Sequence, residues 1–152
     1  MKKLVAALMI AAAAAMLPQT AMAGGMLKME SPHTVKETLD RLQKIFEAKG
    51  ITVFARIDHA AGARSVGSDL LPTELMIFGN PKLGTPLMKL NQEVAFDLPL
   101  KALSWKDKDG KVWLAVTNPA ELNQTYALAG ANGVIEKMTG ALKGLTSKAL
   151  EK

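Results

Sequence analysis

The sequence predicts an α+β domain in which a largely antiparallel sheet carries its helices on one face. The expected elements run in the order helix, strand, strand, helix, three strands, helix, helix, which is not a regular βαβα alternation. The chain has 152 residues, a length that suits one domain. It contains no cysteine, so the fold has no disulfides and must rest on an apolar core.

Residues 1–23 are expected to be a secretory signal peptide rather than part of this domain. Met1-Lys2-Lys3 is a short positive start, and Leu4–Leu17 is an uncharged apolar run. Ala21-Met22-Ala23 has the small residues of a cleavage site, so we expect cleavage after Ala23. A membrane helix is the alternative, but it needs about 20 apolar residues. We therefore expect a periplasmic or secreted protein.

Removing the leader changes what the composition implies. The formal net charge of +5 falls to +3, because Lys2 and Lys3 leave with it. Such a charge without a lysine or arginine run does not favour a nucleic-acid partner. Four of the nine methionines also leave, which removes the case for a methionine-rich copper carrier. No later segment reaches the length of a membrane span.

The first helix has the clearest signals. Met26, Leu27 and Met29 precede it as candidates for a first strand. Thr34-Val35-Lys36-Glu37 has the pattern of a capping box, and Gly50 is placed for a left-handed helix end. An apolar stripe at helical spacing joins these two ends. Its members are Val35, Leu39, Leu42, Ile45 and Phe46.

Two strands are expected next. Ile51–His59 alternates apolar and polar residues, which is typical of a half-buried strand. Residues 60–74 hold small residues, two glycines and a proline, and predict either a long loop or a loop with a helical turn. Leu75–Phe78 is a short apolar run, expected as a central strand that ends at Gly79-Asn80-Pro81.

Beyond this strand, Thr85-Pro86 predicts a second helix start, because a cap residue precedes a proline. Glu93–Leu98 alternates again and is expected as a strand, with Pro99 at a sheet edge or a bulge. Asp109-Gly110 predicts a hairpin turn between two further strands. These strands are Leu100–Trp105 and Lys111–Val116.

The hairpin places Trp105 and Trp113 symmetrically about its turn. We expect a stabilising pair across the two strands, in preference to a surface that stacks a ligand. Asn118-Pro119 ends the second strand, and helices are expected over Pro119–Leu128 and Val134–Leu150.

Five phrases carry a resemblance to a known family, in order and at matching spacing. They are Thr34–Leu39, Gly50–His59, Phe78–Met88, Asp97–Leu100 and Gly110–Leu114. The chain resembles the domain of unknown function 302 family, from about Ser31 to Leu128. The resemblance implies a small fold with a curved antiparallel sheet, similar in outline to TATA-binding-protein-like folds and often dimeric. It implies no settled activity. The expected division is a leader (1–23), the family domain (24–128) and a C-terminal helix or tail (129–152).

Asp58-His59 is the first candidate site. Neighbours on a strand point to opposite faces, so the pair cannot readily act on one point unless the backbone turns there. One interpretation makes His59 a general base or ligand. The other has Asp58 capping the segment that follows, with His59 hydrogen-bonded in a pocket wall. Both remain open on the sequence alone.

The second candidate is the stretch from Gly79 to Pro86. Free amides at a helix start attract anions, and Lys82 could add charge. A tight connection followed by a capped helix explains the same residues, and no Gly-Lys-Ser/Thr of a P-loop is present. The residues expected to bind a ligand are thus Asp58, His59, Gly79, Asn80, Lys82, Gly84 and Thr85.

The sequence offers no complete catalytic or metal-binding set. Its carboxylates are not paired on one helical face, and no serine lies in a Gly-x-Ser-x-Gly elbow. The two histidines, His33 and His59, are 26 residues apart, without the spacing of a metal site. No catalytic residue, metal ligand or cofactor is therefore assigned.

The favoured hypothesis is a non-enzymatic homodimer that binds a ligand or a protein partner, with a small anion as the candidate ligand. Its groove would lie where the Ile51–His59 strand and the Gly79–Thr85 loop converge. A metal- or haem-dependent protein or enzyme using His59 is the alternative, and an oligomeric structural protein of the envelope is the third.

Overall fold

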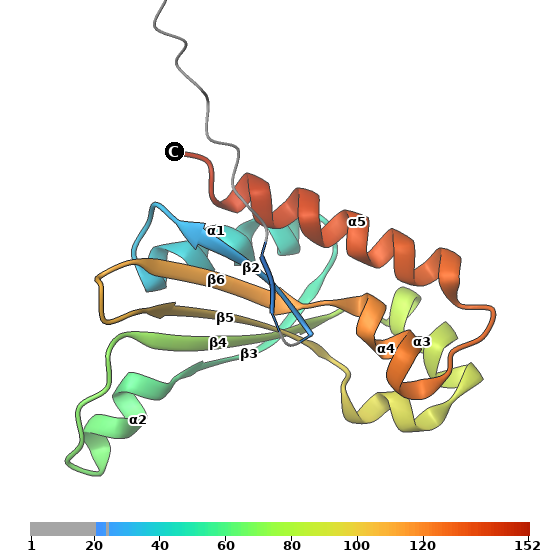
Figure 1. Ribbon diagram of the computed structural model, residues 1–152, viewed down its shortest axis with the longest axis horizontal. Coiled ribbons are helices and arrows are strands. Elements are labelled where there is room, and N and C mark those ends of the chain that lie inside the picture. The colour runs from blue at the N-terminus through green and yellow to red at the C-terminus, as the bar shows by residue number, and fades with distance from the viewer. Residues whose placement is uncertain (1–20, 24) are drawn as a thin grey trace, which may run out of the picture.

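The computed structural model describes residues 21–23 and 25–152, and these form one layered fold (Figure 1). Its strands are β1 (Ala21–Ala23), β2 (Met26–Ser31), β3 (Thr52–Asp58), β4 (Thr73–Gly79), β5 (Leu100–Lys106) and β6 (Val112–Thr117). Its helices are α1 (Val35–Ala48), α2 (His59–Ser65), α3 (Pro81–Leu90), α4 (Pro119–Tyr126) and α5 (Asn132–Ala149), with a 3-10 segment η1 (Gln92–Phe96).

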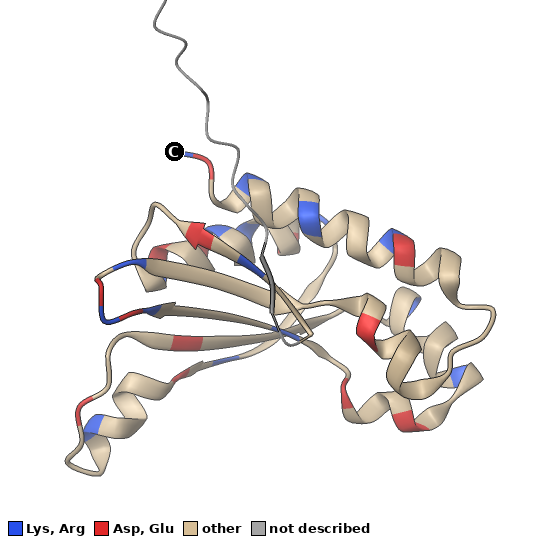
Figure 2. Cartoon of the chain, in the orientation of Figure 1, with Lys and Arg blue, Asp and Glu red and all other residues tan. Residues whose placement is uncertain are grey.

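The strands form one sheet in the order β1-β2-β6-β5-β4-β3, and each neighbouring pair is antiparallel. Figure 1 shows α1 and α5 against one side of the sheet, α2 projecting from one end, and α3, η1 and α4 gathered at the other. Figure 2 shows acidic and basic residues interspersed over these elements. The α+β prediction with an antiparallel sheet is confirmed.

The predicted leader, residues 1–23, lies outside the described residues except for its last three, which form β1 beside β2. Of the helices in the described part of the chain, none has the length and apolar character needed to cross a membrane.

Helix α1 begins and ends where its sequence predicts. The Thr34 hydroxyl accepts a hydrogen bond from the Glu37 amide at 3.2 Å, and Gly50 takes the left-handed φ of +69°. The stripe between them is buried against the sheet. At its end the ring of Phe46 lies 4.4 Å, centroid to centroid, from that of Phe78 on β4. Both rings belong to the apolar core.

Strand β3 departs from the simple alternation expected for it. A bulge between Val53 and Ala55 shifts its register against β4. Val53 therefore packs against the core, while Ala55 and Ile57 are exposed. The bulge also leaves Phe54 exposed at the start of the strand.

The predicted helix start at Thr85-Pro86 is wrong, because α3 begins at Pro81. The Asn80 side chain accepts from the Lys82 amide at 3.0 Å, and Pro81 is the first helical residue. The pattern of a cap followed by proline occurs twice within seven residues, and the first occurrence starts the helix.

The predicted strand over Glu93–Leu98 is also wrong. The Asn91 side chain accepts from the Glu93 amide at 2.9 Å and starts the 3-10 segment η1. Val94 is buried there, but Phe96 is 89% exposed. The alternation thus reflects one inward side chain on a short turn rather than the face of a strand.

The predicted hairpin is confirmed. Trp105 pairs with Trp113 in the β5–β6 register, with ring centroids 6.5 Å apart. The Lys28 ammonium lies 4.0 Å from the Trp113 centroid, and the Trp113 indole donates to Asp107 at 2.7 Å. This hydrogen bond lowers the pKa of the Asp107 carboxyl. The turn uses Gly110 at a φ of +83°.

Helix α5 is an integral layer of the fold. Its Ile135, Met138 and Leu142 are buried in the core. Its C-terminal end is held to α1, because Arg41 donates to the Ala149 carbonyl at 2.9 Å and to that of Glu151 at 2.7 Å. The His33 ring lies 2.8 Å from the same Glu151 carbonyl.

Candidate ligand-binding site

A cavity of about 260 Å³ opens where the sheet meets α3 and α5. The sheet provides one wall, the inner side of α3 the second, the segment between η1 and β5 the third, and α5 the last. Most of its lining is apolar: Ile51, Phe54, Phe78, Leu83, Met88, Leu98, Pro99, Met138, Leu142 and Leu145.

Two glycines shape this cavity. A β-carbon at Gly79 would lie 3.3 Å from the Phe54 ring and 3.4 Å from the Pro99 β-carbon, so glycine lets these two side chains close over the end of β4. A β-carbon at Gly84 would meet Leu98 at 3.6 Å, which is ordinary contact. The β-carbon of a larger side chain at Gly84 therefore fits without a clash, and the rest of that side chain would extend into the cavity.

The free amides predicted for an anion site at the start of α3 are not present. The Lys82 amide bonds to the Asn80 side chain, and the amides of Leu83 and Gly84 bond to the Asn80 carbonyl at 2.9 and 3.0 Å. Lys82 itself is exposed and does not line the cavity. This segment is therefore a tight connection followed by a capped helix, which was the alternative to an anion site.

The expected convergence of the two candidate loops within one chain is wrong. The β3–β4 register pairs Thr52 with Gly79 and Asp58 with Glu74. Asp58 thus pairs with a residue that lies five positions along β4 from Gly79, which is roughly 17 Å at the rise of a strand. Of the seven predicted site residues, the cavity is lined by four: Gly79, Asn80, Gly84 and Thr85.

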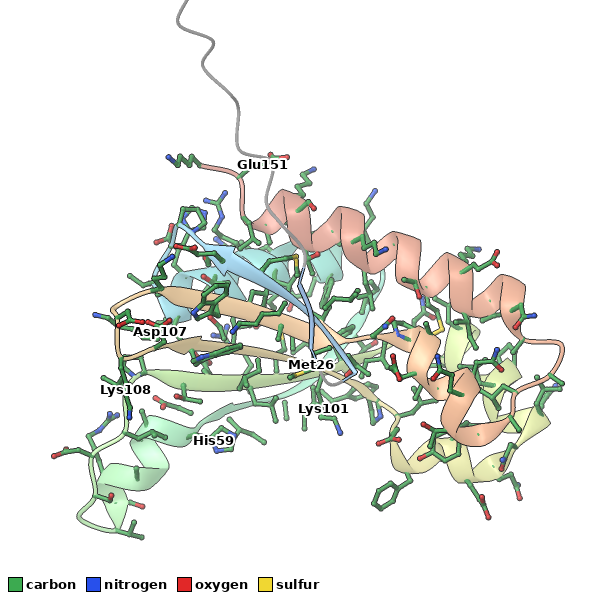
Figure 3. The ribbon with its side chains drawn as sticks, viewed as in Figure 1. Met26, His59, Lys101, Asp107, Lys108 and Glu151 are labelled. Carbon is green, nitrogen blue, oxygen red and sulfur yellow. The ribbon has the colours of Figure 1, made fainter. Side chains whose placement is uncertain are left out.

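Asp58 acts as the cap of α2. Its carboxylate accepts from the Ala61 amide at 2.8 Å, and Arg64 lies 4.0 Å away. His59 is the first residue of this helix and is exposed, so it does not form the pocket wall expected of it. Figure 3 places His59 where β3 meets α2, away from the end with α3.

Replacing Asp58 by alanine is expected to destabilise α2 by about 1 kcal/mol, because the helix loses its N-cap. Hydrogen exchange of the α2 amides measures this locally. Asp58→Asn keeps a cap acceptor and is the matched control, expected to exchange as slowly as wild type. Equal protection in wild type and Asp58→Ala would contradict the capping role.

An ion-pair cluster among the described residues joins α1 to the sheet. No group of three or more histidine or carboxylate side chains in residues 21–23 and 25–152 is arranged to hold a metal ion. Arg56 lies 2.6 Å from both Asp40 and Glu74, and so joins β3, β4 and α1. The Lys36 hydrogen bond, with Arg56 adding to it, lowers the pKa of the Asp40 carboxyl.

The family model described as "Domain of unknown function DUF302" matches residues 27–145. The chain belongs to the DUF302 family. A solved DUF302 structure, an uncharacterized conserved protein from Bacillus stearothermophilus, superposes with a TM-score of 0.66 at 16% identity. The superposition covers 84% of this chain and 97% of that one, and it shows a shared fold.

Curated relatives come from Brucella. "Fluoride-specific ion channel FluC 1" of Brucella suis biovar 1 (strain 1330) is 44% identical over 124 residues, which are 82% of this chain and 49% of the relative. The protein of the same name from Brucella abortus biovar 1 (strain 9-941) is also 44% identical, over 46% of its length. This DUF302 chain therefore spans about half the length of the curated relatives it matches. Fluoride transport is the activity named for those whole proteins.

The DUF302 match includes the whole lining of the cavity, from Ile51 to Leu145. The sequence had indicated the loop after β4 but not the wall contributed by α5. The available signal was the apolar stripe of that helix, which includes Met138, Leu142 and Leu145. The middle of this stripe has two roles, because Met138 and Leu142 belong to the core and also line the cavity.

Proposed function

We propose that this DUF302 domain is an exported, non-enzymatic homodimer that binds a small apolar molecule in the cavity between the sheet, α3 and α5. The observation that supports the proposal is the apolar lining, which provides burial for a ligand and few polar groups to orient one. Asn80 and Thr85 are the polar residues of the lining, and the Asn80 oxygen already caps α3.

The size of the cavity limits the ligand. Its volume of about 260 Å³ lies above the roughly 150 Å³ of an engineered cavity that binds benzene and just below the range of about 300–1,000 Å³ for drug-sized ligands. A compact ring system or a short acyl group fits this range. Such a ligand is held by burial of apolar surface, so its affinity should depend on cavity shape more than on salt.

Filling the cavity is the direct test. Gly84→Leu places a side chain in the lining and should weaken binding of the fluorescent apolar probe N-phenyl-1-naphthylamine by at least about tenfold, a loss of about 1.4 kcal/mol. The measurement is a fluorescence titration of the purified chain, with circular dichroism to show that the fold is kept.

Gly140→Leu is the matched control. Gly140 also lies inside a helix, but a β-carbon there meets nothing within 4 Å, and the residue is exposed on α5 outside the cavity lining. It should bind the probe like wild type. A Gly84→Leu protein that keeps wild-type affinity would overturn the proposed site.

A further inference from the structure

Large apolar side chains are exposed in two groups at opposite ends of the β3–β4 hairpin. The mouth group borders the cavity and consists of Phe54, Leu90 and Phe96. The arm group follows α2 at the other end and consists of Val66, Leu70 and Leu71. Among the described residues these are six of eight exposed large apolar side chains, and gathered exposure of this kind marks an interaction surface.

The mouth group is continuous with the cavity. Phe54 lines it directly. Phe96 follows Ala95, which lines both this cavity and a neighbouring hollow that includes Leu90. At 89% exposure, Phe96 has almost no partner within its own chain. An apolar cover over this mouth would remove all three side chains from water.

Between the two groups runs a free sheet edge. Within the described sheet, β3 has β4 on one side and no strand on the other. The edge is seven residues long and exposes Ala55 and Ile57. Such an edge presents backbone donors and acceptors for pairing with another strand.

We propose that two copies of the chain pair antiparallel along β3, so that the arm of each copy (residues 59–72) closes over the cavity mouth of the other. The inference rests on the proposed homodimer and cavity, and adds how one copy completes the site of the other. A two-fold axis near Ala55, the middle of β3, reverses the second strand. The α2 end of one copy then lies beside the Thr52 end of its partner.

This arrangement matches apolar surface with apolar surface. With the axis near Ala55, His59 of the partner subunit lies opposite Ile51, a residue of the cavity wall. Phe54, one residue from the axis, is then covered by the partner's strand, and the arm beyond His59 of the partner subunit extends towards Leu90 and Phe96. Both exposed groups are therefore covered, twice in the dimer. A single chain cannot do this, because its own arm and mouth are at opposite ends of the hairpin.

The charges at the two ends of β3 also fit antiparallel pairing. Lys49 is exposed just before the strand, and Asp58 is exposed at its end, 4.0 Å from Arg64. Reversing the second strand places each Lys49 three positions beyond the partner's Asp58, roughly 10 Å away and within about one Debye length. The same reversal brings Asp58 and His59 of one copy towards Gly79 and Asn80 of the other, so the groove predicted within one chain forms between two.

Spin labels test the geometry, since a chain without cysteine accepts a label at one chosen position. Ala55→Cys should give a label-to-label distance under about 20 Å, because it lies beside the axis. Val66→Cys should give about 40 Å, because the arms point away from each other across the strand length and α2. A monomer at all concentrations, or a longer distance at residue 55 than at residue 66, would overturn the proposal.

A second measurement tests the cover. The double variant Leu70→Ser, Leu71→Ser should weaken the dimer and release N-phenyl-1-naphthylamine about tenfold faster, since the arm no longer covers the mouth with apolar surface. Met26→Ser, at an exposed apolar residue on β2, is the control and should change neither quantity. Unchanged dimer and unchanged release in the arm variant would overturn the inference.

The two proposals fail differently. If Gly84→Leu blocks the probe while the arm variant behaves like wild type, the cavity binds its ligand without the partner's arm, and only the inference is lost. If Gly84→Leu leaves probe binding unchanged, the proposed function itself is lost, whatever the spin labels report about the dimer.

Discussion

Truncation of Phe46 to alanine is expected to lower the free energy of unfolding by about 3–5 kcal/mol, the usual cost of removing a large buried side chain. Phe46 is fully buried at the end of α1 and contacts Phe78, which also lines the cavity. The expected loss has two parts: the free energy of transferring the ring from water to the core, and the cost of the cavity that its removal leaves. Urea unfolding followed by tryptophan fluorescence measures it.

Phe96→Ala is the matched control, because the same ring is removed from a side chain that is 89% exposed. At protein concentrations where scattering shows a monomer, it should cost less than about 0.5 kcal/mol. Similar losses for the two variants would show that Phe46 is not the centre of the core.

Arg56→Met is expected to cost about 2–3 kcal/mol, because it leaves the Glu74 carboxylate partly buried without its cation. The Glu74 side chain is only 16% exposed, and that of Arg56 20%. The cost stays below the 3–5 kcal/mol of a fully buried pair, since water still reaches both groups. Thermal or urea unfolding at neutral pH measures it.

Lys36→Met is the control on the same cluster. Lys36 also contacts Asp40, but its side chain is 78% exposed, so its loss should cost less than about 0.5 kcal/mol. Adding Glu74→Met to Arg56→Met removes the unpaired charge and should recover part of the stability. A double variant less stable than Arg56→Met would contradict this account.

The cluster of Asp40, Arg56 and Glu74 makes the free energy of unfolding depend on pH. The pKa of Asp40 in the folded chain lies below its ordinary value of 3.8, through the Lys36 hydrogen bond first and Arg56 next. Its contribution to stability is therefore complete above pH 3.8 and is lost as the pH falls through the lowered pKa. In Arg56→Met only the Lys36 contact remains to lower the pKa of Asp40, so the loss of stability in acid should be smaller than in wild type.

Elements with strong local signals could be predicted from the sequence. Helix α1 has a cap, a stripe and a terminating glycine that agree with one another, and its bounds follow from them. The β5–β6 hairpin is set by Asp109-Gly110, which also fixes the register of Trp105 with Trp113. Neither feature depends on a distant part of the chain.

Elements with competing local signals could not be predicted from the sequence. Asn80-Pro81 and Thr85-Pro86 are equivalent as helix starts until the end of β4 is fixed by its pairing with β3 and β5. Likewise, Val94 and Phe96 alternate with polar or small residues as in a strand. Only the tertiary packing, which buries Val94 and leaves Phe96 exposed, shows that the segment is a short turn.

The site was the hardest part to predict because it is assembled from distant segments. Its floor comes from residues near Ile51 and Phe78, while its far wall comes from Leu142, more than 60 positions later. The separation of Asp58 from Gly79 follows from the antiparallel register of β3 with β4. This register cannot be predicted from the composition of the two loops. The sequence could indicate polar loop residues, but not which of them share a space.

Strand β1 forms one border of the sheet, beside β2. It consists of Ala21–Ala23, the residues that cleavage after Ala23 would remove. These residues pair with β2, so the predicted cleavage would make β2 a second open border of the sheet. Lys28 and Glu30 on β2 would then be the charges that discourage unwanted strand addition there.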